Sequence, residues 1–168
     1  MNILSLDAST KSTGYAIYEG STLKTYGCIT SSSTDLIKRI HKMVDEIKIL
    51  LTENKIDKII LEEVRPENGT QNIKTHRALM WLQGALAIMT HDDFPKIETV
   101  YTYPSEWRKA CNIKTGRGVV RETVKQHDIR FVEETFGIKV NDDIADAIGI
   151  GYAYLHPGGK EEMIYWGE

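Results

Sequence analysis

Four carboxylates occupy positions from which they could gather into one site. Asp7 and Glu62 each close a largely apolar run with the pattern of a buried strand. Asp143 and Asp146 lie three residues apart near the start of an expected helix. Neighbouring parallel strands bring their carboxyl ends to one edge of a sheet, and residues three apart share a helix face. We therefore expect the four side chains to converge.

Four converging carboxylates would be stabilised by a bound cation. Negative charges crowded into a partly buried site repel one another strongly unless positive charge is bound between them. Mg²⁺ and Mn²⁺ are hard cations that prefer oxygen ligands of this kind. The pattern therefore predicts a site for Mg²⁺, with Mn²⁺ as a substitute, held by Asp7, Glu62, Asp143 and Asp146.

Each carboxylate also has an ordinary structural explanation. An aspartate after a strand is most often a turn former. Glu62 beside Glu63 fits a solvated strand end, and Asp143 and Asp146 fit the electrostatics of a helix N-terminus. These explanations account less well for the whole set, because Asp7 and Glu62 interrupt otherwise apolar strands.

The hydrophobic pattern predicts the elements that must position these residues. Three short strands joined by tight turns come first and form an antiparallel meander; helices then alternate with two further strands. The expected strands cover residues 3–7, 13–18, 22–29, 56–62 and 97–103. The expected helices cover residues 35–51, 75–91, a short segment opening at 105–107, 119–136 and 141–155.

The sequence allows further predictions for three of these helices. Residues 31–34 are Ser or Thr and supply an N-cap for the first helix. Apolar residues surround most of the helix at 75–91, which is therefore either deeply buried or shared with a partner chain. Gly149 and Gly151 weaken the last helix, and close packing of that helix on the sheet would explain them.

The order of elements predicts an α/β fold with a mixed sheet. An antiparallel three-strand meander continues into parallel strands with helical crossovers, and helices flank the sheet. The length of 168 residues fits one compact domain. We assign residues 1–155 to this domain and residues 156–168 to a tail that is rich in Gly and Pro, then acidic, and only partly ordered.

The composition indicates a cytoplasmic protein. No apolar run approaches the ~20 residues that a bilayer span needs, so we expect no membrane association. The N-terminus lacks the basic region of a signal peptide. Cys28 and Cys111 lie far apart, which predicts neither a disulfide framework nor a zinc site and favours a reducing compartment, the cytoplasm of a bacterial or a phage-infected host cell.

The charge is unevenly distributed. The net charge is −3, but residues 105–130 contain seven Lys and Arg against three Asp and Glu, whereas residues 131–168 contain two against eight. A metal-dependent nuclease needs a basic stretch that attracts phosphate beside an acidic one that holds cations. On charge alone, two solvated surfaces are the more ordinary explanation, favoured by roughly two to one.

Three segments in order resemble the motifs of the RuvC family of Holliday junction resolvases, whose fold is RNase H-like. Residues 6–17, LDASTKSTGYAI, resemble the first motif, with an aspartate before a turn of small residues. Residues 60–64, ILEEV, resemble the second, and residues 143–150, DIADAIGI, resemble the third. Residues 82–85, LQGA, are similar to the helix that follows the second motif.

This resemblance implies a homodimeric, Mg²⁺-dependent endonuclease acting on branched DNA. Two metal ions roughly 4 Å apart would be held by the four carboxylates. One would activate a water for in-line attack on the phosphodiester, and the other would stabilise the leaving 3′ oxygen. The residues that match the family's DNA-contacting region are Arg108, Lys114, Arg117, Arg121 and Lys125. Of these, Arg117 is expected nearest the scissile phosphate and is counted with the catalytic residues.

One departure from the family bears on the substrate. Several members carry an aromatic residue soon after the catalytic glutamate that wedges into the junction, but residues 64–69 contain none. We therefore expect cleavage of forks and flaps as well as four-way junctions. The shortness of the motifs and the residues that they contain also suggest a phage-type relative.

Two other functions compete with the nuclease. Residues 7–14 also resemble the phosphate-binding hairpin of actin-like kinases and ATPases, but those phosphotransferases need a second lobe and a far longer chain. The other alternative is a module that binds branched DNA without catalysis. The presence of all four candidate ligands argues against it.

Overall fold

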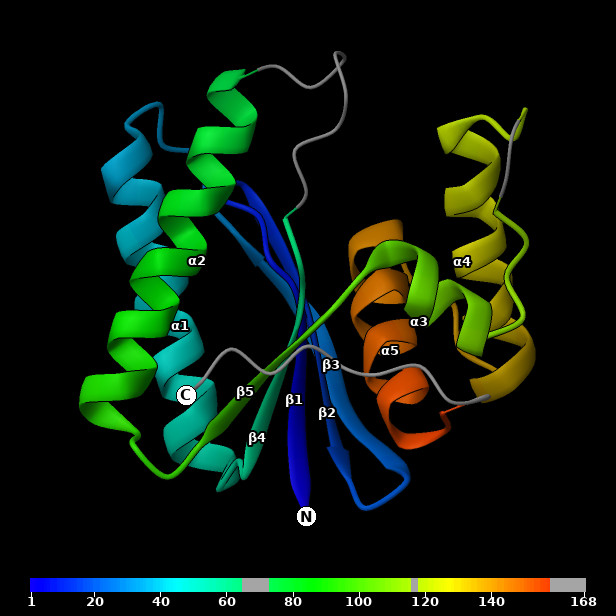
Figure 1. Cartoon of the computed structure of the whole chain (residues 1–168), viewed down its shortest axis with the longest axis horizontal. Coiled ribbons are helices and arrows are strands. Elements are labelled where there is room, and N and C mark those ends of the chain that lie inside the picture. Colours follow the sequence, from blue (N-terminus) through cyan, green and yellow to red (C-terminus); the bar gives the residue numbers. More distant parts are fainter. Residues whose placement is uncertain (65–72, 116–117, 158–168) are drawn as a thin grey trace.

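The computed structural model describes residues 1–64, 73–115 and 118–157. Within these ranges the chain forms five strands and five helices (Figure 1). The strands are β1 (Asn2–Asp7), β2 (Ser12–Glu19), β3 (Thr22–Thr30), β4 (Lys58–Glu62) and β5 (Glu98–Thr102). The helices are α1 (Leu36–Asn54), α2 (Ile73–Asp93), α3 (Pro104–Ala110), α4 (Arg121–Phe136) and α5 (Asp142–Leu155).

The five strands form one mixed sheet in the order β3-β2-β1-β4-β5. β2 pairs antiparallel with β1 and β3, whereas β4 pairs parallel with β1 and β5. Gly20 makes the tight turn between β2 and β3 at a positive φ of 60°, a backbone conformation that glycine adopts without strain. The predicted α/β fold, a meander continued by parallel strands, is confirmed.

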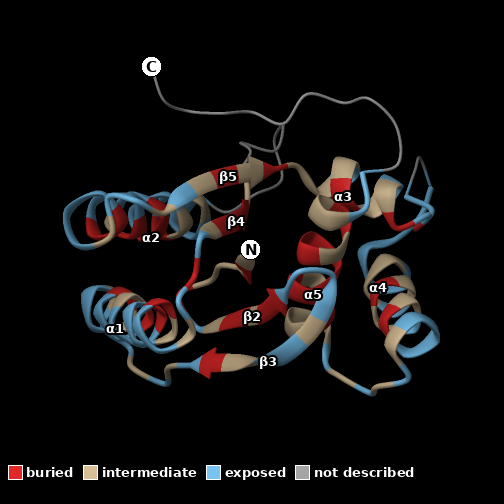
Figure 2. Ribbon diagram, turned by 90° about the horizontal axis from the view of Figure 1, so that it is seen from below, coloured by how far each residue is buried: buried red, intermediate tan, exposed pale blue. Residues whose placement is uncertain are grey.

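Helices cover both faces of the sheet. α1 and α2 lie against one face, and α3, α4 and α5 lie against the other (Figures 1 and 2). Strand side chains point alternately to the two faces. β1 therefore contributes Ile3 to the core beneath α5, and Leu4 and Leu6 to the core beneath α1 and α2. The central strand that ends at Asp7 is thus enclosed on both sides.

α1 begins one residue later than predicted, and its N-cap is Asp35. The Asp35 carboxylate accepts hydrogen bonds from the backbone N–H groups of Ile37 and Lys38. The prediction that the Ser/Thr run of residues 31–34 supplies the cap is therefore wrong. The hydroxyls stand too early in the chain to reach the free N–H groups of the first turn. Such a cap stabilises a helix by about 1 kcal/mol.

α2 has one buried face and one exposed face. Its buried residues include Leu82, Leu86 and Met89, which belong to the core shared with α1. On the other face Trp81 is 48% exposed and Ile88 65% exposed. Of the two expectations for this apolar helix, deep burial throughout is thus wrong. The exposed apolar residues fit the other one, a surface shared with a partner.

α5 packs on β1 and β2 at close range because small residues face the strands. A Cβ atom at Gly151 would lie 2.6 Å from Ser5 Oγ and 2.5 Å from the Tyr18 ring. At Gly149 it would lie 2.6 Å from the Trp107 ring. These glycines lower the intrinsic stability of the helix, yet they permit the approach that the rest of the fold uses. The close packing predicted from them is confirmed.

The remaining helices lie within two residues of their predicted bounds. α4 ends at Phe136, and Gly137 occupies the predicted C-cap position in a left-handed conformation with φ 70°. Cys28 and Cys111 are both free, as predicted. No helix among the described residues is long and apolar enough to cross a membrane. Most of the predicted tail, residues 158–168, lies outside the described residues.

Candidate active site

Strand register brings Asp7 and Glu62 side by side. β1 and β4 are parallel neighbours, and Leu6 pairs with Leu61, so the next residue on each strand is a carboxylate. Both strands end at that point. The turn after Asp7 is closed by Thr13, whose hydroxyl donates to the Ser9 carbonyl oxygen at 2.5 Å. The prediction that adjacent strand ends place these two carboxylates together is confirmed.

The N-terminus of α5 meets the same edge of the sheet. Asn141 caps the helix by accepting a hydrogen bond from the Ile144 N–H at 3.0 Å. Gly14 pairs with Asp7 across β1 and β2. A Cβ at Gly14 would stand only 1.9 Å from the Asp143 carbonyl oxygen. Contact with a bare glycine backbone therefore sets Asp143 beside the strand pair that carries Asp7.

Electrostatics shows that the four carboxylates share one environment. Burial raises the pKa of Asp7, and the charges of Glu62 and Asp143 raise it further. Burial also raises the pKa of Asp146, and Asp7 is the largest of the neighbouring charges that add to it. The pKa of Glu62 is raised as well, again chiefly by burial. Ionisation of Asp7, Glu62 and Asp146 is therefore opposed by desolvation and by neighbouring negative charges.

Three of the four carboxylates have a dedicated polar partner. Glu62 Oε2 accepts a hydrogen bond of 2.7 Å from the indole Nε1 of Trp107. Asp143 accepts from the hydroxyl of Ser12 at the start of β2. Asp146 pairs with Arg108, at 3.3 Å between Asp146 Oδ2 and Arg108 Nη2. The site is therefore held by residues of β2 and α3 in addition to those that carry the carboxylates.

Arg108 lies inside this network. Its guanidinium makes a bidentate contact with Asp128 of α4, at 3.0–3.1 Å from Nε and 2.9 Å from Nη2. Asp128 is fully buried, and the side chain of Arg108 is 14% exposed. The guanidinium also lies over the Trp107 ring, 4.3 Å from its centroid. Arg108 thus pairs with both Asp128 and Asp146, whereas the sequence predicted that it contacts a DNA phosphate.

The other predicted DNA contacts differ in their surroundings. Lys114 and Arg121 are exposed. Burial raises the pKa of Glu62, and the positive charge of Arg121 offsets part of that rise. Lys125 forms an ion pair with Asp142 at the start of α5. Arg117 lies outside the described residues.

The donor set fits a divalent cation. Carboxylate oxygens are the ligands that Mg²⁺ and Mn²⁺ prefer. Asp146 Oδ1 is buried and has no hydrogen-bond partner among the residues that the structure describes, and a buried anionic oxygen without a partner is costly. Among the described residues, no group of three or more His, Cys, Asp or Glu side chains is arranged, as it stands, so that it could hold a metal ion. The four carboxylates are thus neighbours whose oxygens are partly engaged by Trp107, Ser12 and Arg108.

Sequence reasoning did not identify the residues that support the carboxylates. Ser12 lies within the first motif but its contact with Asp143 spans 131 residues of chain. Trp107 has no local pattern that distinguishes it from a core residue. Asp128 did carry a signal, because it lies four residues before buried Val132 and therefore on the inward face of α4.

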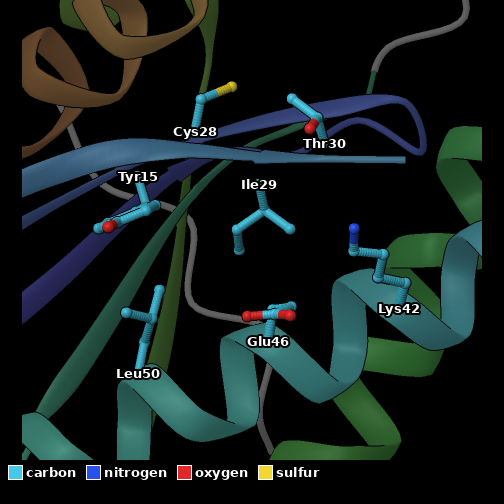
Figure 3. A pocket seen from close by; sticks show the side chains of 7 residues that line it. All are labelled: Tyr15, Cys28, Ile29, Thr30, Lys42, Glu46 and Leu50. Atoms are coloured by element: carbon cyan, nitrogen blue, oxygen red, sulfur yellow. The ribbon is translucent and has the colours of Figure 1, made fainter. Parts of the chain in front are cut away.

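A groove lies elsewhere, between the meander and α1 (Figure 3). Its lining residues are Tyr15, Cys28, Ile29, Thr30, Lys42, Glu46 and Leu50. In Figure 3 the Cys28 side chain lies on the other side of the strand from Tyr15, Ile29 and Leu50, and its sulfur lies 3.0 Å from Ser12 Oγ. The groove therefore opens on the α1 face of the sheet, whereas Cys28 reaches toward the carboxylates.

A mixed sheet of this order, with acidic residues at the ends of two adjacent parallel strands and on a helix packed against them, defines the RNase H-like class of nuclease fold. Residues 3–154 match the family described as "Crossover junction endodeoxyribonuclease RuvC". The chain therefore belongs to the RuvC family, whose members are structure-specific, metal-dependent DNA endonucleases. The resemblance predicted from the three motifs is confirmed.

Individual relatives agree with this assignment. The chain is 28% identical to the RuvC protein of Alkaliphilus oremlandii over 97% of its own length and 98% of that protein. T. thermophilus RuvC in complex with a Holliday junction superposes with a TM-score of 0.69 at 13% identity, covering 92% of this chain and 94% of that one. The Fowlpox virus resolvase, also with junction DNA, gives 0.57 at 18% identity, covering 94% and 98%. The expected phage origin has no support among these relatives.

Replacing Asp7 by asparagine should stabilise the metal-free protein. Burial and neighbouring charge raise the pKa of Asp7 from 3.8 to about 8, so its ionisation opposes folding increasingly as the pH rises through that interval. With a chelator present, we expect Asp7→Asn to melt roughly 2–4 °C higher than the wild type near pH 8, or about 1 kcal/mol. The gain should vanish near pH 4.

Thermal denaturation of both proteins across this pH range provides the measurement. Added Mg²⁺ should shrink the difference, because a bound cation offsets the repulsion that the substitution removes. A variant that melts at or below the wild-type temperature near pH 8 would show that Asp7 is not under electrostatic strain.

Proposed function

We propose that this chain is an endonuclease that cuts branched DNA, namely four-way junctions and also forks and flaps, by metal-dependent hydrolysis of a phosphodiester bond. The observation that carries the proposal is the gathering of Asp7, Glu62, Asp143 and Asp146 into one partly buried environment, in which neighbouring negative charges raise the pKa values of Asp7 and Asp146. A protein tolerates such crowding at a functional site more readily than in a structural core.

The four carboxylates would hold the divalent cations, two per site in our proposal. Bound there, Mg²⁺ or Mn²⁺ would supply an activated water for in-line attack and a positive charge for the leaving 3′ oxygen. The protein side chains orient this chemistry. Arg108 fixes Asp146 from one side, Ser12 fixes Asp143, and the strand ends fix Asp7 and Glu62.

The basic residues around the site would receive the DNA backbone. Lys114 and Arg121 are exposed, and Arg121 lies within electrostatic reach of Glu62. They are the best supported phosphate contacts. We retain Arg117 as the residue nearest the scissile phosphate on the basis of the family resemblance alone. Lys125 and Arg108 would act more indirectly, because they already pair with Asp142 and with Asp128.

Branched DNA as the substrate is supported by the relatives. T. thermophilus RuvC and the Fowlpox virus resolvase have both been captured with Holliday junction DNA. Residues 64–69 lack an aromatic side chain that could wedge into a junction. Substrates that already expose a flexible branch point should therefore suit this chain, because bending a stiff duplex toward a recessed site costs energy.

A homodimer would present two such sites. The exposed face of α2 carries Ile73, Met80, Trp81 and Ile88, with exposed fractions from 46% to 79%. An apolar stripe along one helix is the kind of surface that an identical copy can cover. We propose pairing through this face, which would direct the two sites to symmetry-related strands of one junction.

We further propose that residues 1–155 form the whole nuclease domain and that the protein acts in the cytoplasm. The family match ends at residue 154 and α5 ends at Leu155. Two free cysteines fit a reducing compartment.

Each carboxylate should be indispensable for cleavage. We expect Asp7→Asn, Glu62→Gln, Asp143→Asn and Asp146→Asn to slow cleavage of a labelled four-way junction by roughly a hundredfold or more, with binding unchanged or tighter. Mg²⁺ and Mn²⁺ should support turnover, and Ca²⁺ should support binding alone. Asp45→Asn, an exposed change on α1, is the control and should cut normally. Near-normal cutting by Asp146→Asn would remove that residue from the site.

The substrate range can be read from one set of DNAs. We expect symmetric paired nicks in four-way junctions, single nicks in forks and flaps, and little cutting of linear duplex, when all are compared at one enzyme concentration. The reason is that a distorted backbone enters the recessed site at lower cost than stiff duplex. Cutting confined to four-way junctions would restrict the proposed range, and efficient cutting of linear duplex would contradict it.

Neutralising the exposed basic residues should weaken the salt dependence of binding. Each of Lys114→Ala and Arg121→Ala should lower the slope of log affinity against log salt by about one unit, because one phosphate contact releases about one counterion. Lys42→Ala, an exposed lysine on the opposite face, should leave the slope unchanged. Arg117→Ala should in addition slow cleavage at saturating DNA. Slopes equal to that of the wild type would show these residues to be ordinary solvated surface.

A further inference from the structure

Trp107 is one of the largest fully buried side chains among the described residues, and it lies beside the carboxylates. It is 1% exposed and belongs to the core formed with α4 and α5. Its one polar atom, Nε1, donates to Glu62 Oε2 at 2.7 Å. Trp107 therefore connects the hydrophobic core, which its ring fills, with the carboxylate site, to which its N–H donates.

The packing of α3 on α5 fixes the direction of this N–H. Gly149 leaves the space that the ring occupies, since a Cβ there would lie 2.6 Å from ring atom Cζ3 and 3.1 Å from Cε3. A second contact comes from the adjacent Arg108, whose guanidinium lies 4.3 Å from the ring centroid and is itself anchored by buried Asp128. The ring is thus confined by α5 and by the Arg108 side chain, and the indole N–H has little freedom to leave Glu62.

Glu62 is also held through its backbone. The buried side chain of Gln83 on α2 donates from Nε2 to the Glu62 carbonyl oxygen at 2.7 Å. α2 lies on one face of the sheet and α3 on the other (Figure 1). Glu62 is therefore fixed from both faces, by Gln83 at its backbone and by Trp107 at its side chain.

Fixing Glu62 in this way can keep its carboxylate oriented for a further ligand. A glutamate side chain has three rotatable bonds, and neighbouring negative charges push it toward solvent. A single donor leaves the carboxylate with acceptor capacity for a further ligand. Hydrogen bonds that orient a metal-binding carboxylate commonly change metal affinity by ten- to a hundredfold.

We propose that Trp107 is a positioning residue, whose indole N–H holds the Glu62 carboxylate in the orientation that receives a divalent cation. The inference rests on the proposed function, because it requires a cation at these carboxylates. It makes cation affinity depend on a core tryptophan of α3, a helix that carries none of the four ligands.

Trp107→Phe tests this role because phenylalanine keeps an aromatic ring and loses the N–H. The matched control is Tyr18→Phe, which removes a buried hydrogen bond of the same length, 2.7 Å from the Tyr18 hydroxyl to the Ile148 carbonyl oxygen. Tyr18 belongs to the same core and contacts the same helix, but it has no bond to Glu62. Both variants should lower the melting temperature of the chelated protein.

The two variants should differ in cation binding. Calorimetric titration with Mn²⁺ should give an affinity about tenfold weaker for Trp107→Phe and unchanged for Tyr18→Phe. Equal affinities in both variants and the wild type would overturn the inference and leave the proposed function standing. A wild-type protein that binds no Mn²⁺ would overturn both.

A second measurement avoids any change at Trp107. In a protein carrying Trp81→Phe and Trp166→Phe, Trp107 is the one remaining tryptophan. Mn²⁺, which is paramagnetic, should quench its fluorescence with the same midpoint that calorimetry gives. Adding Glu62→Gln should weaken that response about tenfold or more. If saturating Mn²⁺ leaves the fluorescence intensity unchanged, Trp107 is not near the bound cation.

Discussion

The structure depends on how closely α5 approaches the sheet. Gly14 on β2 and Gly151 on α5 remove the side chains that would keep the two apart, and Ser5 of β1 donates a hydrogen bond of 2.7 Å to the Ala147 carbonyl oxygen. This approach has a direct consequence for the site. It sets the first turn of α5, with Asp143 and Asp146, against the end of the strand that carries Asp7. Without that approach the carboxylates would be scattered acidic residues.

The same approach creates an electrostatic cost that the surrounding residues offset only in part. Breaking a buried ion pair typically costs 3–5 kcal/mol because it leaves one charge unpaired, which makes the buried Asp128–Arg108 pair a firm anchor. From that anchor Arg108 reaches Asp146. The pKa of Asp146 is nevertheless raised, and one of its oxygens is buried with no hydrogen-bond partner in the described part of the chain. The protein thus organises its negative charge but does not neutralise it, and a cation would supply the missing positive charge.

Local patterns in the sequence revealed the residues that carry the carboxylates but not those that support them. Asp7 and Glu62 could be predicted because strand ends and parallel pairing are visible in hydrophobic runs, and the glycines of α5 implied close packing. Arg108 was placed on a DNA-facing surface because a basic stretch looks the same whether its members face solvent or a buried aspartate. The contacts of Trp107 with Glu62 and of Ser12 with Asp143 span 45 and 131 residues. No periodicity within one element encodes such pairs.

The two faces of the sheet are joined at the end of β4. On one side α3 brings Trp107 to the side chain of Glu62, and on the other side α2 brings Gln83 to its backbone carbonyl. The outward face of α2 is the apolar stripe that includes Trp81 and Ile88. Gln83 and Trp81 are two residues apart, so their side chains leave the helix in different directions. One helix therefore carries both the exposed apolar face that we propose for pairing and the amide that fixes the backbone of Glu62. A partner that orders α2 would also act on the strand end where Glu62 is held.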